Sequence, residues 1–185
     1  MKIGEVISFL EENKNKTKIH CATGDIHNFE ALYVLSKGNF KEWQEGQSKK
    51  NFERDYILSI IYMAKNEWLF AGIYRSMNVN EITVGENVRG FIRPGKYLYD
   101  TELTEYGKEL IGKMVINFEK EFRQSYLLLE NYIDDLTICE IKRHEYKFDP
   151  FSGYTNVDVQ FDLLKEIIKN NEKSWETALS NVKGI

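Results

Sequence analysis

Side chains of the types that most often carry catalysis are sparse in this sequence. Four residues of metal-ligand types fall within eight positions: His20, Cys21, Asp25 and His27. A metal site normally combines closely spaced ligand pairs, and the sequence has no C-x-x-C or H-x-x-x-H pair. It also lacks a G-x-S-x-G nucleophile turn and a complete G-x-x-x-x-G-K-[ST] phosphate loop. We therefore expect neither a metal site nor a catalytic centre in this chain.

An aromatic and amide-rich segment, residues 40–48, is the first candidate binding element. Helical spacing places four of its side chains on one face: Phe40, Trp43, Gln44 and Gln47. A buried amide needs hydrogen-bond partners, whereas an exposed Gln can read base edges and a Trp can stack on bases. Two interpretations stay open. One is a nucleic-acid contact continued by Lys49 and Lys50, and the other is a surface helix whose aromatic side chains pack into the core.

A second candidate is the stretch from Val88 to Tyr99, which contains no acidic residue. Its cations and aromatic rings are interleaved: Arg89, Phe91, Arg93, Lys96, Tyr97 and Tyr99. Basic side chains bind phosphate and aromatic rings stack on bases. We therefore expect this stretch, with Arg75 beside it, to contact nucleic acid. The alternative interpretation is a barrel hairpin whose charges are merely solvated.

The spacing of apolar residues predicts helices at both ends of the chain and strands between them. Residues 3–13 carry an amphipathic helix pattern, and the strongest β signal is a hairpin of residues 56–63 and 68–74, apolar on both faces. Further strands are expected at 17–22, 81–84, 96–100, 112–118 and 136–142, and further helices at 28–36, 123–131, 160–171 and 174–182. This order predicts an α+β fold with a mainly antiparallel, barrel-like β core and flanking helices.

Composition and charge narrow the class of protein. The chain is 42% hydrophobic, enough for a core, but no apolar run approaches the roughly 18 residues of a membrane span. Acidic residues near the N-terminus argue against a signal peptide. Cys21 and Cys139 are expected to be free, buried thiols in a reducing cytoplasm. A net charge of −4 means that nucleic-acid binding would need a local basic patch.

Several segments together resemble the N-terminal region of some bacterial GIY-YIG nuclease-family proteins. The matching segments run from Phe40 to Gln47, Trp68 to Tyr74, Phe151 to Val157 and Trp175 to Ile185. In the last of them a short Trp-bearing helix precedes Gly184-Ile185, which resembles the first two letters of the Gly-Ile-Tyr motif. The resemblance implies a recognition domain over residues 1–150, a helical connector over 151–185 and a missing C-terminal nuclease domain.

Residues 72–74 also read Gly-Ile-Tyr, with Arg93 further along, and so echo the nuclease motif itself. However, Thr83 stands where the family has its second Tyr, and Pro94-Gly95 stands where the family places its Arg-bearing helix. We therefore expect that this chain does not cleave DNA and holds no cofactor. The resemblance assigns a divalent metal such as Mg²⁺ to the missing nuclease domain only.

The aromatic hairpins are also similar to PUA-like and EVE-like barrels, which implies a pocket for a modified or flipped base. That pocket would combine an aromatic cage from Trp43, Tyr74, Tyr97 and Tyr99 with polar contacts from Gln44, Gln47 and Arg93. The expected function is DNA recognition, extending to modified-base sensing, with DNA rather than a membrane as partner. The alternatives are an interaction or dimerisation module, which would make the chain a homodimer, and a barrel that binds a small molecule.

Overall fold

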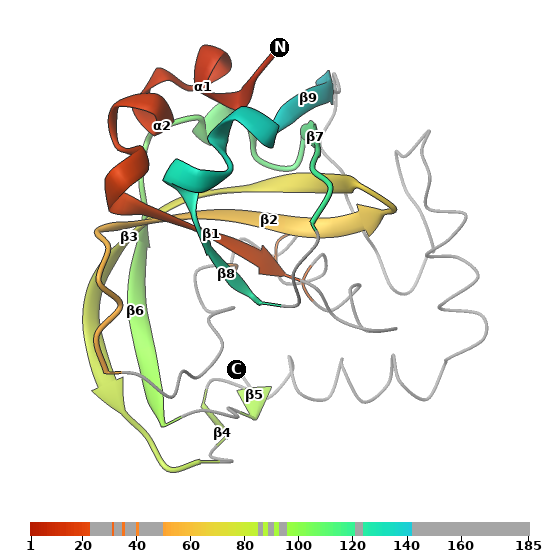
Figure 1. The fold of residues 1–185 in the computed structure, drawn as a ribbon. Coiled ribbons are helices and arrows are strands. Elements are labelled where there is room, and N and C mark those ends of the chain that lie inside the picture. The colour runs from red at the N-terminus through yellow and green to blue at the C-terminus, as the bar shows by residue number, and fades with distance from the viewer. Residues whose placement is uncertain are drawn as a thin grey trace, which may run out of the picture.

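The fold of this chain comes from a computed structural model, drawn in Figure 1. It describes residues 1–22, 31, 35, 40, 50–84, 87–88, 91–92, 96–120 and 124–141. The helices predicted at 28–36 and 40–48 fall almost entirely outside these residues. The connector predicted at 151–185, with the helices at 160–171 and 174–182, falls outside them altogether.

The N-terminal helix predicted over residues 3–13 is present but divided. Helix α1 (Ile3–Val6) and helix α2 (Ser8–Glu12) meet at Ile7, whose φ of −122° and ψ of 86° are not helical. A short 3₁₀ turn, η1 (Lys14–Lys16), follows. Ile3, Ile7 and Leu10 are buried, so the break lets both short helices bury their apolar side chains against the sheet.

One mixed sheet of seven strands forms the body of the described chain. Its path is β8-β1-β2-β3-β7-β9, and β6 pairs with β3 off this path. The strands are β1 (Thr17–Ala22), β2 (Tyr56–Ala64), β3 (Glu67–Glu81), β6 (Tyr97–Leu103), β7 (Met114–Asn117), β8 (Tyr126–Leu128) and β9 (Thr137–Ile141). The sheet is curled (Figure 1). Its strands, together with the short helices α1 and α2, confirm a β-rich α+β fold.

The core is mainly antiparallel, as predicted, but one strand pair departs from this pattern: β1 and β2 are parallel, with Thr17 paired to Tyr56. Every other strand pairing in the described part of this sheet is antiparallel. A parallel pair requires a crossover connection, and residues 23–55 supply it. A tight turn in the sequence identifies two neighbouring antiparallel strands. A long connection carries no such signal, so the sequence of residues 23–55 does not reveal that β1 and β2 are neighbours.

The hairpin predicted from 56–63 and 68–74 is confirmed as β2 and β3, joined at Asn66, whose φ of 60° suits a tight turn. Strand β3 continues to Glu81, much further than predicted. Its first half pairs with β2 and β7, and its second half pairs with β6 across a register shift between Ser76 and Val79. In Figure 1 this second half bends away from β2 and runs beside β6.

Two sequence predictions about elements are wrong. Residues 123–131 were expected to be helical, but their described part holds strand β8 and the 3₁₀ turn η4 (Leu129–Asn131). Leu127 and Leu129 are both buried, and Leu127 pairs with Ile19, so pairing with β1 overrides the helical propensity of the leucines. Residues 82–84 belong to no strand, because β3 ends at Glu81.

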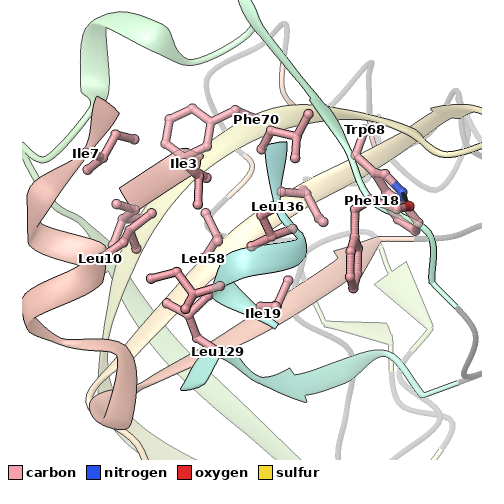
Figure 2. Close-up of a cluster of buried hydrophobic side chains, with 14 of the residues drawn as sticks. Ile3, Ile7, Leu10, Ile19, Leu58, Trp68, Phe70, Phe118, Leu129 and Leu136 are labelled. Atoms are coloured by element: carbon pink, nitrogen blue, oxygen red, sulfur yellow. Dashed lines mark hydrogen bonds between the residues drawn. The ribbon is translucent and has the colours of Figure 1, made fainter. Parts of the chain in front are cut away.

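The hydrophobic core lies between the sheet and helices α1 and α2. Figure 2 shows Ile3, Ile7 and Leu10 from the helices facing Leu58 and Phe70 from the sheet, with Phe118 and Trp68 at one end. The Trp68 indole N–H donates to the Phe118 carbonyl at 2.9 Å, so this buried polar atom is paired.

Cys21 belongs to the same core, and burial raises the pKa of its thiol to about 12. Cys139, expected to be buried, is exposed; both cysteines are free.

The opposite side of the sheet, called here the second face, carries His20, Ile57, Ser59 and Ile61, which alternate with core residues along β1 and β2. These side chains are also buried. Phe40 and Phe52, from the connection between β1 and β2, lie with their ring centroids 6.3 Å from Tyr74 and 4.9 Å from Tyr99. The buried rings of Phe40 and Phe52 therefore contribute apolar cover on this side, and the prediction of a sheet apolar on both sides is confirmed.

The loop after β6 is fixed by one glycine and supplies a stability prediction. Gly107 has a φ of +65°, and a Cβ added there would lie 2.6 Å from Cδ1 of Ile7. We expect Gly107→Ala to destabilise the fold by about 1–3 kcal/mol in urea unfolding, because it adds both left-handed strain and a clash. Gly4→Ala is the control. Gly4 lies in α1, and the nearest atom to a Cβ added there would be Oε2 at the flexible end of Glu11, at 3.1 Å. The other neighbours, in Glu11 and Ile133, lie at 3.5 Å or more, so this substitution should leave stability unchanged or raise it. Equal effects of the two substitutions would contradict this account of the loop.

Candidate functional site

The second half of β3 and strand β6 form a two-stranded ribbon that leaves the body of the sheet (Figure 1). Its register runs from Tyr74 opposite Leu103 to Glu81 opposite Tyr97. From Arg75 onward the residues of β3 are exposed or half-buried, whereas the residues from Trp68 to Tyr74 are buried. The burial pattern thus divides one strand into a structural half and an accessible half.

A small hairpin lies in sequence between the two strands of this ribbon. Strand β4 (Asn87–Val88) pairs with β5 (Phe91–Ile92) in antiparallel register, Asn87 opposite Ile92 and Val88 opposite Phe91. No strand was expected from the sequence at residues 87–88 or 91–92, so this small hairpin is a finding of the structure. Arg89 joins the two strands in sequence and Arg93 follows β5, and both lie outside the described residues.

Residues 90–96 match the first seven positions of a phosphate loop, G-x-x-x-x-G-K, but Tyr97 stands where that motif has Ser or Thr. A phosphate loop joins a strand to the start of a helix. Here Phe91 and Ile92 form a strand inside the pattern, and the strand β6 follows Lys96 directly. The match therefore belongs to a hairpin, and Lys96 does not sit at a helix N-terminus.

Lys96 and Tyr97 stand where β6 begins. The Lys96 ammonium lies 3.0 Å from Oε1 of Glu81 and 5.6 Å from the centroid of the Tyr97 ring. The hydrogen bond from Lys96 to Glu81 raises the pKa of the lysine. Both partners of the ion pair are more than half exposed, so the pair adds little stability and its lysine stays accessible to another anion.

Tyr74 and Tyr99, predicted as cage residues, are both buried. The Tyr74 hydroxyl donates to the Ala71 carbonyl at 2.9 Å, and burial raises its pKa. Tyr99 packs on Phe52, and burial raises its pKa as well. Tyr97 is half-buried beside Lys96. Trp43, Gln44 and Gln47 lie outside the described residues, but they belong to the connection whose Phe40 lies near Tyr74.

Arg75 lies apart from the other described cations, in a groove of about 370 Å³ where the ribbon meets the body. The groove is lined by Arg75, Glu102, Leu103, Thr104, Glu105 and Tyr106. Arg75 pairs in register with Glu102, and its guanidinium lies 5.9 Å from the centroid of the Tyr56 ring. Two carboxylates against one guanidinium do not favour phosphate. The structure therefore does not bring Arg75 together with Lys96, whose neighbour Tyr97 pairs with Glu81 at the far end of the ribbon.

Sequence reasoning missed a buried polar pair on the second face. His20 on β1 and Ser59 on β2 are register partners, and both are completely buried. Within the described part of the chain, neither His20 ring nitrogen nor the Ser59 hydroxyl has a hydrogen-bond partner. Burial, with a smaller effect of the Lys120 charge, lowers the pKa of His20 to about 3, so the ring is neutral. The one available signal was a single Ser in the otherwise apolar run from Ile57 to Ile61.

No group of three or more His, Cys, Asp or Glu side chains within the described ranges is arranged to hold a metal ion.

The Gly-Ile-Tyr run at 72–74 lies in the middle of β3, with Tyr74 buried and hydrogen-bonded to the backbone. Among the helices that the structure describes, none is long and apolar enough to cross a membrane.

Comparisons of the whole chain with known proteins give no relative. No family model, no curated protein and no solved structure matches it. What the chain does therefore has to be inferred from the ribbon, the hairpin and the second face described above.

Proposed function

We propose that this chain is a DNA-recognition domain and that the hairpin β4–β5, with the adjoining end of the β3–β6 ribbon, is its DNA-contacting element. One observation carries the proposal. The acid-free basic stretch from Val88 to Tyr99 coincides with a hairpin carried between the two strands of an accessible ribbon. A two-stranded β-ribbon fits the major groove of DNA.

The distribution of charge supports contact by the hairpin rather than by the whole ribbon. The described strands of the ribbon carry Glu81, Asp100 and Glu102 as well as Arg75, so their sides do not attract phosphate. The cations Arg89, Arg93 and Lys96 are concentrated around the hairpin. A local basic cluster of this kind can bind phosphate although the chain as a whole carries a net charge of −4.

Three finer parts of the proposal rest on fewer observations. A PUA-like closure of the barrel is favoured by the curl of the sheet and by its aromatic second face. Attachment to a GIY-YIG nuclease rests on the sequence of residues 151–185 alone. Modified-base sensing, with Trp43, Gln44 and Gln47 as contacts chosen from the sequence, is part of the same proposal.

The test is binding of the 185-residue chain to a short DNA duplex labelled with a fluorophore, followed by anisotropy over a range of salt concentrations. We expect the affinity to fall steeply with added salt, because bound cations release counterions from DNA. Each of Arg89→Ala and Arg93→Ala should weaken binding by about tenfold and reduce the logarithmic salt slope by about one.

A charge-matched control uses Lys14→Ala and Lys108→Ala, two exposed lysines that pair with Glu11 and Glu105 outside the ribbon. These variants should bind as the unmodified chain does. Binding that is weak, insensitive to salt or equally reduced in both sets would contradict the proposal. If the arginine variants instead changed the sedimentation coefficient and not DNA affinity, the hairpin would be a protein interface.

A further inference from the structure

The buried pair His20 and Ser59 has no role in the proposed contact of the hairpin with DNA. The two residues face each other on adjacent parallel strands, on the second face and completely buried. Three polar atoms are unpaired within the described residues: Nδ1 and Nε2 of His20 and Oγ of Ser59. A buried polar atom without a partner costs about 1–3 kcal/mol, so three such atoms side by side demand an explanation.

The surroundings of this pair are aromatic. The Tyr126 ring stacks on His20 with centroids 4.7 Å apart and an angle of 13° between the planes. Phe52 meets Tyr126 edge-on at 5.5 Å, and the Lys18 ammonium lies 4.6 Å from the centroid of the Phe52 ring. Flat rings around a neutral imidazole suit a flat partner better than a tetrahedral one.

The chemistry of the two side chains limits the partner further. A neutral imidazole offers one N–H donor and one nitrogen acceptor, and a serine hydroxyl offers both functions. Together they can satisfy a ligand edge that carries a donor next to an acceptor. No carboxylate among the described residues bonds to either side chain, so a buried cation would lack a charge partner. Burial lowers the pKa of His20 more than the Lys120 charge does, so a buried anion would be only weakly compensated. An uncharged ligand therefore fits best.

We infer that His20 and Ser59 form a binding site for an uncharged, planar heterocycle with a hydrogen-bond donor and an acceptor on one edge. Tyr126, with Phe52 packed against it, forms an aromatic wall. Because both polar side chains are buried, a ligand reaches them only when the Tyr126 ring that stacks on His20 turns aside. A base within DNA and a free nucleoside share this chemistry, and the inference does not require the hairpin to bind DNA.

The experiment uses adenosine, cytidine and thymidine as separate probes, with ribose as the probe that lacks a heterocycle. Saturation-transfer NMR with the whole chain measures their binding. We expect at least one nucleoside to bind and ribose not to bind. Ser59→Ala removes one oxygen and His20→Phe keeps a ring but removes both nitrogens, and each should weaken nucleoside binding by about tenfold or more. Ser76→Ala, the same change at a half-buried residue of β3, is the matched control and should have no effect.

Several outcomes separate this inference from the proposed function. If no nucleoside binds, or if nucleosides bind equally to the unmodified chain and to both variants, the site is overturned and the pair is only a feature of the fold. Salt-dependent DNA binding could still stand in that case. If nucleosides bind through His20 and Ser59 while the duplex does not bind, the site stands and the DNA proposal fails. If duplex binding weakens both in the hairpin arginine variants and in the His20 and Ser59 variants, the ligand of the site is a base of the DNA.

Circular dichroism of each variant excludes unfolding as the cause of lost binding. Ser59→Ala is the smaller change and settles the matter if His20→Phe does not fold. A folded Ser59→Ala chain that retains full nucleoside affinity contradicts a role for its hydroxyl.

Discussion

Phe70→Ala is expected to destabilise the fold by about 3–5 kcal/mol, because the large ring is removed from a core that cannot fully collapse around the space. Phe70 is completely buried in the cluster between the sheet and the N-terminal helices. It also supports the loop after β6, since a Cβ at Gly107 would lie 3.3 Å from its ring. Urea unfolding followed by tryptophan fluorescence measures the change, with three tryptophans as the reporter.

The control for this prediction lies on the same strand. Met77 is on the accessible half of β3 and is 51% exposed, so Met77→Ala should change stability by no more than about 0.5 kcal/mol. A small effect at Phe70, or equal effects at both positions, would contradict the division of β3 into a buried half and an accessible half. It would also remove the argument that the second half is available for binding.

Local signals made part of this fold predictable. The β2–β3 hairpin combines two strongly apolar runs with a turn at Asn66, so its strands and its connection are visible within a short window. β1 was predicted with the observed bounds, Thr17–Ala22. The length of β3 was not predictable in the same way, because its residues beyond Arg75 are polar and are held by pairing with β6.

Long-range pairing explains most of what the sequence did not reveal. The parallel neighbours β1 and β2 are joined by residues 23–55, and nothing local identifies Tyr56 as the partner of Thr17. The segment around Leu127 has helix-forming leucines, yet its place beside Ile19 makes it a strand. Contacts between residues distant in sequence decide both cases, and propensity is only a weak prior against them.

The two candidate sites differ in the same way: one has a local signal in the sequence, and the other depends on long-range pairing. The basic and aromatic composition of the stretch from Val88 to Tyr99 is visible in the sequence, although its short strands β4 and β5 were not predicted. The pair of His20 and Ser59 exists only because two strands come together. Tyr99 was predicted as an accessible ring and is buried, because Phe52, distant from it in sequence, packs against it.

The pH dependence of stability tests the buried state of His20 directly. Its pKa is about 3 in the folded chain against an ordinary value of 6.5, which we take for the unfolded chain. Below pH 6.5 the unfolded chain binds a proton on His20 that the folded chain does not bind, so stability falls as pH falls. This loss continues until the pH approaches 3 and amounts to roughly 1 kcal/mol for each pH unit. Above pH 7 His20 contributes no pH dependence.

His20→Phe isolates this effect from the titration of carboxylates, which both chains share. The difference in unfolding free energy between the unmodified chain and His20→Phe should be constant above pH 7. Between about pH 6 and pH 3 it should shift steadily against the unmodified chain. Urea unfolding at a series of pH values measures it. A difference that stays flat down to pH 4 would show that His20 takes up a proton equally in the folded and unfolded chains, which requires a polar partner or solvent at its ring. That result would remove the neutral, unpaired imidazole on which the heterocycle site depends.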